Sequence, residues 1–138
     1  MNVLVVDDER LLRWSLERLF TKHQVGVITV GSGEEALQYL AKNHFDWLVT
    51  DLRLPGISGF DVLRFAKDIQ PQIQCIVISA FGSQQTRAEL KRIGIHLYLD
   101  KPFDLDFLLQ TILHAKAPAF DEEQKTPKKK TSKLLSLL

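Results

Sequence analysis

Five short apolar runs, each three or four residues long and rich in Val, Ile and Leu, limit most strongly how this chain can fold. Runs of this length are too short for helices, and their apolar residues are mostly consecutive rather than alternating. That pattern is typical of strands covered on both faces, as in a parallel sheet. The predicted strands are residues 3–6, 27–30, 47–49, 75–78 and 97–99.

Segments with helical spacing separate these runs. Their apolar residues recur every three or four positions, which places them on one face of a helix. Segment 84–93 is the weakest predicted helix, because Gln, Thr and Ser dominate its start. Polar residues that can cap the first unpaired N–H groups of a helix occur at Ser32, Ser58 and Asp104. The four clear stripes are Leu12, Leu16 and Leu19; Ala36, Leu37 and Leu40; Val62, Phe65, Ala66 and Ile69; and Leu105, Leu108 and Ile112.

Strand and helix therefore alternate five times, with strand starts 20 to 28 residues apart. This spacing is typical of βαβ units and predicts an α/β, doubly wound, five-stranded parallel sheet with five helices on its two faces. One such domain accounts for residues 1–116. Beyond it the periodicity stops, and residues 117–138 are predicted to be a basic, flexible tail.

The net charge of +1 hides an asymmetry between these two parts. Residues 125–138 carry five Lys and no acid, whereas residues 1–124 have a net charge of −4. A chain with so little overall charge has no field that would attract nucleic acid, and no direct nucleic-acid binding is expected. No apolar run approaches the roughly 18 residues of a membrane span. The single cysteine, Cys75, excludes an intrachain disulfide, so a cytoplasmic location is expected.

Polar residues follow four of the five predicted strands. Asp7 and Asp8 follow the first strand, Asp51 the third, Ser79 the fourth and Lys101 the fifth. Because the carboxyl ends of parallel strands share one edge of the sheet, these side chains should converge there. Three carboxylates at one point repel each other, and a hard divalent cation such as Mg²⁺ relieves that repulsion.

A lysine and a serine beside a metal-bound carboxylate would hold an anion with several oxygens, and a phosphoryl group is the obvious candidate. An aspartate can itself accept a phosphoryl group when metal and lysine neutralise the charge. Asp51 has both supports, which makes it the candidate acceptor.

Short motifs lie at these strand ends, namely Asp7-Asp8, Asp51 with Pro55 and Gly59, Ser79-Ala80, and Tyr98 with Lys101-Pro102-Phe103. In their order and spacing they resemble the receiver domain of two-component response regulators, over residues 1–116. The resemblance implies the flavodoxin-like receiver fold. The motif sequences are most similar to those of receivers that precede the ATPase domain of enhancer-binding, NtrC-type transcription activators.

The resemblance implies that Asp51 accepts a phosphoryl group from a sensor histidine kinase or a phosphotransfer protein. The chain would then be a phosphoacceptor rather than an enzyme acting on other substrates. The resemblance also implies the ligands of Mg²⁺, which are Asp7, Asp8, Asp51 and the backbone carbonyl of Arg53.

The remaining implied roles concern the response to phosphorylation. Ser79 hydrogen-bonds the phosphoryl group, Lys101 pairs with it, and the Lys101–Pro102 peptide bond is cis. Tyr98 then turns inward, and the face formed by the fourth helix, fifth strand and fifth helix changes its preference for a downstream protein or for a second copy of the chain.

Two other interpretations stay open at this point. A pseudo-receiver would be a scaffold without the chemistry, although the full acid, serine and lysine set argues against it. An aspartyl-phosphate phosphatase usually carries a second Asp two residues after the nucleophile, where this chain has Arg53. The residues after 116 are too few for an ATPase or a DNA-binding domain, so we expect a stand-alone receiver or one excised from a transcription activator.

Overall fold

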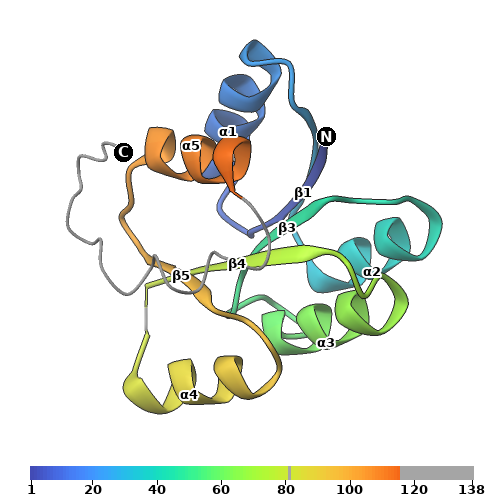
Figure 1. Ribbon diagram of the computed structural model, residues 1–138, viewed down its shortest axis with the longest axis vertical. Helices are drawn as coiled ribbons and strands as arrows, with labels where there is room; N and C mark the ends of the chain where they lie inside the picture. The colour runs from blue at the N-terminus through green and yellow to red at the C-terminus, as the bar shows by residue number, and fades with distance from the viewer. Residues whose placement is uncertain (81, 116–138) are drawn as a thin grey trace.

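A five-stranded parallel sheet forms the centre of the structure, with the strand order β2-β1-β3-β4-β5. The computed structural model describes residues 1–80 and 82–115 (Figure 1). All five predicted runs are strands, and the predicted fold class is confirmed. The strands are β1 (Asn2–Val6), β2 (Gly26–Val30), β3 (Trp47–Asp51), β4 (Gln74–Ser79) and β5 (Leu97–Asp100).

Five helices connect and follow the strands. Helices α1 and α5 cover one face of the sheet, while α2, α3 and α4 cover the other (Figure 1). The segment predicted as the weakest helix is helical in the structure. The helices are α1 (Arg10–Lys22), α2 (Gly33–Lys42), α3 (Gly59–Ile69), α4 (Gln84–Arg92) and α5 (Leu105–His114).

Side-chain caps determine where four of these helices begin. The Ser32 and Ser58 hydroxyls accept hydrogen bonds from N–H groups three residues later, and the Asp104 carboxylate accepts one from two residues later. These three caps were predicted. Ser83 caps α4 in the same way, at 3.1 Å from the N–H of Thr86, which explains how a helix with few apolar anchors begins there.

Two apolar cores form because successive strand residues point to opposite faces of the sheet. In β1, Val3 and Val5 pack with buried residues of α1 and α5, such as Phe20. Leu4 and Val6 face the other core, which α2, α3 and α4 complete. Burial on both faces explains why the strands read as continuous apolar runs.

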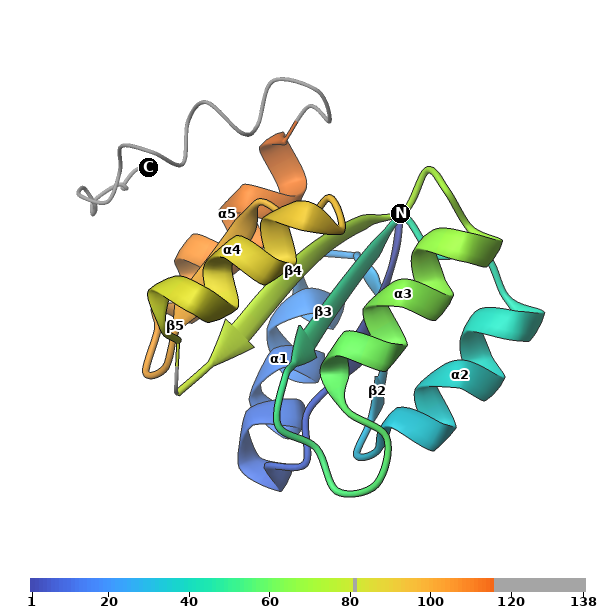
Figure 2. The same ribbon diagram turned by 90° about the horizontal axis from the view of Figure 1, so that it is seen from below.

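The order of the strands places the candidate site. From β1 the sheet extends to β2 on one side and to β3 on the other, so β1 and β3 flank the point where the chain reverses its direction of winding. Val6 lies beside Thr50 in the register of these two strands. The carboxyl ends of β3 and β4 point to the same edge (Figure 2). Ligands bind at such a switch point in open α/β sheets.

The predicted tail, residues 117–138, lies outside the described residues. Among the residues that the structure describes, no helix is both long enough and apolar enough to cross a membrane.

Candidate functional site

Three aspartates converge at the switch point. Asp7 follows β1 and is fully buried, Asp51 ends β3 and is 6% exposed, and Asp8 is exposed. One carboxylate oxygen from each lies within 4.8 Å of the others. The structure therefore brings together the three acids that the strand ends predicted, in an arrangement that could hold a metal ion.

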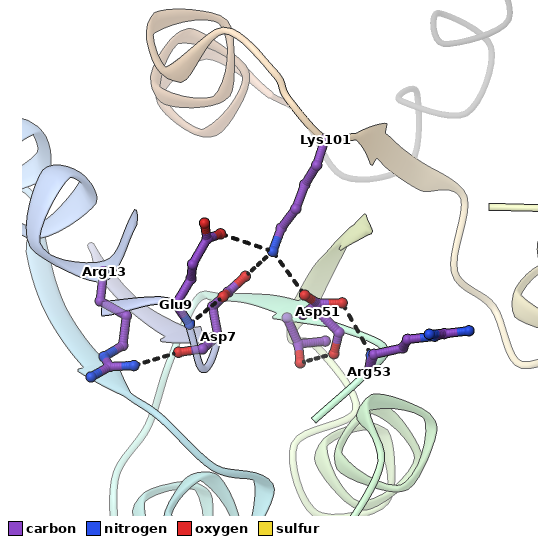
Figure 3. Close-up of polar contacts among 7 residues, drawn as sticks. Asp7, Glu9, Arg13, Asp51, Arg53 and Lys101 are labelled. Carbon is purple, nitrogen blue, oxygen red and sulfur yellow. Dashed lines mark hydrogen bonds and ion pairs between the residues drawn. The ribbon is translucent and has the colours of Figure 1, made fainter. Parts of the chain in front are cut away.

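Lys101, which directly follows β5, neutralises part of this charge. Its Nζ lies 2.7 Å from Asp7 Oδ2, 2.8 Å from Asp51 Oδ2 and 3.5 Å from Glu9 Oε1 (Figure 3). Burial opposes charge on the ammonium, but its hydrogen bonds and charge interactions with Asp51 and Asp7 outweigh burial and raise the pKa of Lys101. The lysine is therefore fully protonated at neutral pH.

The two carboxylate oxygens of Asp7 have different surroundings. Its Oδ1 accepts a hydrogen bond of 2.8 Å from the Glu9 N–H, whereas the buried Oδ2 is paired with the Lys101 ammonium at 2.7 Å and has no other partner among the described residues. Burial raises the pKa of Asp7, and the interactions with Lys101 and the Glu9 N–H only partly offset that rise. A buried carboxylate oxygen whose one partner is an ammonium, beside two further carboxylates, fits the oxygen ligands that Mg²⁺ prefers.

Replacing Asp7 with asparagine should stabilise the chain in the absence of divalent cations. Because the folded-state pKa is raised, ionised Asp7 costs stability at neutral pH, and this cost disappears as the pH falls through the folded pKa toward the ordinary value of 3.8. We expect Asp7→Asn to raise the free energy of unfolding by about 1 kcal/mol at neutral pH and by less in acid. Urea denaturation at several pH values measures this difference. A variant less stable than the native chain at neutral pH would contradict the prediction.

The loop after β3 holds the Asp51 carboxylate in place. Asp51 Oδ1 accepts a hydrogen bond of 3.0 Å from the Arg53 N–H, and the Thr50 hydroxyl donates to the Asp51 carbonyl at 2.9 Å. The Gly59 N–H donates to the Leu52 carbonyl at 3.0 Å, which ties the first residue of α3 to the loop. The backbone of Arg53 is thus beside Asp51, and the Arg53 side chain is exposed. That the Arg53 carbonyl is a Mg²⁺ ligand stays a prediction.

Ser79 and Tyr98 lie on the β4 and β5 side of the site. Ser79 is buried at the end of β4, and its carbonyl accepts a hydrogen bond of 2.9 Å from the Lys101 N–H. The Lys101–Pro102 peptide bond is cis. The Tyr98 hydroxyl is buried against Gly82, where an added Cβ would lie 2.8 Å from Tyr98 Cε1.

The buried Tyr98 hydroxyl lies beside Ser79. Burial raises the pKa of Tyr98, and the interaction with the Ser79 side chain acts in the opposite direction. Unlike Asp7 and Asp51, which contact Lys101 directly, Tyr98 belongs to a neighbouring cluster with α4.

Sequence reasoning missed three members of these two clusters. Glu9, the third carboxylate near Lys101, directly follows the acid pair, and that position is a signal that could have identified it. Arg87 of α4 stacks over the Tyr98 ring, 4.3 Å from its centroid, and pairs with Asp100 at 3.1 Å. Nothing local in the sequence marks the pairing of Arg87 with Asp100, because helix packing creates it.

The comparisons with known proteins agree on one family. Residues 3–113 match the family described as the response regulator receiver domain. The chain is 32% identical over 124 residues to the DNA-binding transcriptional regulator NtrC of Klebsiella pneumoniae, covering 90% of this chain and 26% of that protein. It thus spans about a quarter of that relative's length. It is also 31% identical over 105 residues to sporulation initiation phosphotransferase F of Bacillus subtilis, covering 76% of this chain and 85% of that protein.

Solved structures show the same fold. The non-phosphorylated HemR receiver domain from Leptospira biflexa superposes with a TM-score of 0.77 at 27% identity, covering 85% of this chain and 97% of that one. A response regulator from Burkholderia pseudomallei, solved with a phosphorylated aspartic acid, calcium ion and citrate, gives 0.77 at 26% identity, covering 91% and 75%. The sheet order, the acidic cluster at its switch point and these matches lead to one conclusion: the chain belongs to the response regulator receiver domain family of two-component systems.

Proposed function

We propose that this chain accepts a phosphoryl group on Asp51 in a Mg²⁺-dependent reaction, from a phosphohistidine of a sensor kinase or phosphotransfer protein. The observation that carries the proposal is the position of the Lys101 ammonium, 2.7 Å from Asp7 and 2.8 Å from Asp51, beside three carboxylates that converge within 4.8 Å. Receivers are in general phosphoacceptors rather than enzymes, which agrees with this role. A cytoplasmic location stays a prediction.

The proposed reaction is a transfer between two nucleophiles. An Asp51 carboxylate oxygen forms a bond to phosphorus while the bond from phosphorus to the donor nitrogen breaks, and the electron pair of that bond stays on the imidazole. A bound Mg²⁺, held by Asp7, Asp8, Asp51 and the Arg53 carbonyl, would offset the negative charge of the incoming phosphoryl oxygens.

The protein supplies orientation and charge for this transfer. The Arg53 N–H fixes one Asp51 oxygen at 3.0 Å. Lys101, which is held by Asp7 as well as by Asp51, keeps a positive charge where phosphoryl oxygens would arrive. Ser79, buried at the end of the neighbouring strand, is the proposed hydrogen-bond donor to the phosphoryl group.

Mass spectrometry of the intact chain with acetyl phosphate tests the proposal. We expect a gain of one phosphoryl group in the presence of MgCl₂, no gain with a chelator, and localisation of the label to the peptide that contains Asp51. Absence of label under all conditions would favour the pseudo-receiver scaffold. Continued release of phosphate over many turnovers would favour a phosphatase.

Tyr98 and the face of α4, β5 and α5 form the proposed output switch. The Tyr98 hydroxyl is buried even without a phosphoryl group, so phosphorylation would shift the population of this inward position rather than create it. The proposed partner of this face is a downstream protein or a second copy of the chain. Beryllofluoride, a phosphoryl mimic, should shift amide resonances over residues 84–100 more than those of α2, and equal shifts would argue against the switch.

Arg87 should keep Tyr98 in its inward position. Replacing Arg87 with alanine removes both the stacked guanidinium and the ion pair with Asp100, so we expect larger motion of the Tyr98 ring and a loss of about 1 kcal/mol in stability. The Tyr98 ring resonances in NMR spectra report the motion. Arg64→Ala is the matched control, because Arg64 is equally exposed, at 51%, and also contacts a ring and an acid. Unchanged Tyr98 resonances in Arg87→Ala would contradict the prediction.

A further inference from the structure

Three hydrogen bonds hold Asp7 in addition to its ion pair with Lys101. Its N–H donates to the Val30 carbonyl at 3.1 Å, and its Oδ1 accepts from the Glu9 N–H at 2.8 Å. Its backbone carbonyl accepts from Arg13 Nη1 at 2.7 Å (Figure 3). The fourth atom, Oδ2, is paired with the Lys101 ammonium at 2.7 Å, faces the other acids, and has no further partner among the described residues. Arg13 is the one side chain among these three partners, since the others are backbone groups.

The Arg13 guanidinium also lies against the chain that follows β2. A Cβ added at Gly31 would lie 3.0 Å from Arg13 Nη1 and 3.3 Å from its Cζ. In addition, the Arg13 backbone N–H donates to the Glu9 carbonyl at 3.2 Å. The arginine therefore connects the first turn of α1 to the β1–α1 loop and passes across the end of β2. This placement leaves the loop that carries the acids little freedom to move.

We infer that Arg13 is a positioning residue for the metal site: it orients Asp7 through the backbone carbonyl and so keeps Oδ2 aimed at the cation. The inference rests on the proposed function, because it assumes that Mg²⁺ binds at Asp7, Asp8 and Asp51. Residues that orient metal ligands without touching the metal typically change metal affinity by 10- to 100-fold when they are replaced.

Because Arg13 is positively charged, a positioning role and a purely electrostatic effect predict opposite changes in Mg²⁺ affinity when it is replaced. A guanidinium near a cation site repels the cation, so on charge alone its removal would strengthen Mg²⁺ binding. A positioning role predicts the opposite, because the loop loses its anchor. The sign of the change in affinity thus distinguishes the two explanations.

An NMR titration with MgCl₂ measures that sign. The amide resonances of residues 7–9 and 51–53 give the dissociation constant for the native chain and for the variants. We expect Arg13→Ala to weaken Mg²⁺ binding about tenfold and Arg13→Lys to recover part of the loss, because lysine keeps one donor and the charge. Arg18→Ala is the control, since Arg18 lies on the same helix with the same charge but stacks on Trp14, 4.9 Å from its ring centroid. It should bind Mg²⁺ as the native chain does.

Urea denaturation without Mg²⁺ shows whether Arg13→Ala is folded. If it is not folded, a second variant tests the inference. Gly31→Ala retains the arginine and its charge but crowds the guanidinium, which must shift by a few tenths of an ångström, so it should also weaken Mg²⁺ binding, by a smaller factor. If Arg13→Ala folds and binds Mg²⁺ as tightly as the native chain or more tightly, the positioning role is wrong. If only Gly31→Ala folds, unchanged Mg²⁺ binding in that variant has the same meaning. A native chain without any Mg²⁺-dependent shift would overturn the proposed metal site itself, and this inference with it.

Discussion

Asp51→Asn should abolish phosphorylation of the chain by acetyl phosphate. Asparagine has nearly the shape of aspartate and can still accept the hydrogen bond from the Arg53 N–H, but its neutral amide is not a nucleophile toward phosphorus. Lys101 would keep Asp7 as an ion-pair partner at 2.7 Å, so the fold should survive the change. We therefore expect complete loss of the label with retention of the folded structure.

Intact-mass spectrometry with MgCl₂ measures this loss, and circular dichroism checks the fold. Asp68→Asn is the matched control, because Asp68 is an exposed acid on α3. That variant should be labelled at the native rate. Label that persists in Asp51→Asn would mean that a neighbouring acid, such as Asp8, is the acceptor.

Gly59→Ala should destabilise the fold strongly, because α3 begins in direct contact with the end of β3, the strand that carries Asp51. A Cβ on Gly59 would meet the Asp51 carbonyl oxygen and lie 2.7 Å from the Leu52 Cα. Both are backbone atoms, so no side-chain rotation relieves the clash. We expect a loss of about 3 kcal/mol in the free energy of unfolding, at the upper end of ordinary overpacking.

Urea denaturation measures the loss, and Gly94→Ala calibrates it. Gly94 has φ +86 and open space where a Cβ would lie, so alanine there costs only the backbone strain of a positive φ, about 1 kcal/mol. If Gly59→Ala lowered the free energy of unfolding no more than Gly94→Ala does, the start of α3 would have to lie farther from β3 than it does in the structure, which would contradict the prediction.

Much of the fold was predictable because its signals are local. The strands read as apolar runs since both faces of the sheet are covered, and the caps at Ser32, Ser58 and Asp104 depend on residues two or three positions apart. Segment 84–93 was the least secure helix for the same reason, because its apolar signal is weak and the Ser83 cap was not recognised.

The candidate site was predictable in part. A general rule of parallel sheets brings strand ends to one edge, and that rule was enough to gather Asp7, Asp51 and Lys101. It carries no information about which oxygens meet which nitrogens. The contacts of Arg13 and Arg87 could not be predicted from the sequence, because each depends on how a helix packs against a loop or strand.

By itself the sequence determined the repeated strand and helix units and the polar residues at the strand ends, because periodicity and capping act between near neighbours. The tertiary structure alone decided that the Lys101 ammonium lies between Asp7 and Asp51, although Lys101 is fifty residues from Asp51 in the sequence, and that the buried Asp7 Oδ2 faces this ammonium. Such distances result from the packing of the whole sheet and its helices, since no short segment contains both partners.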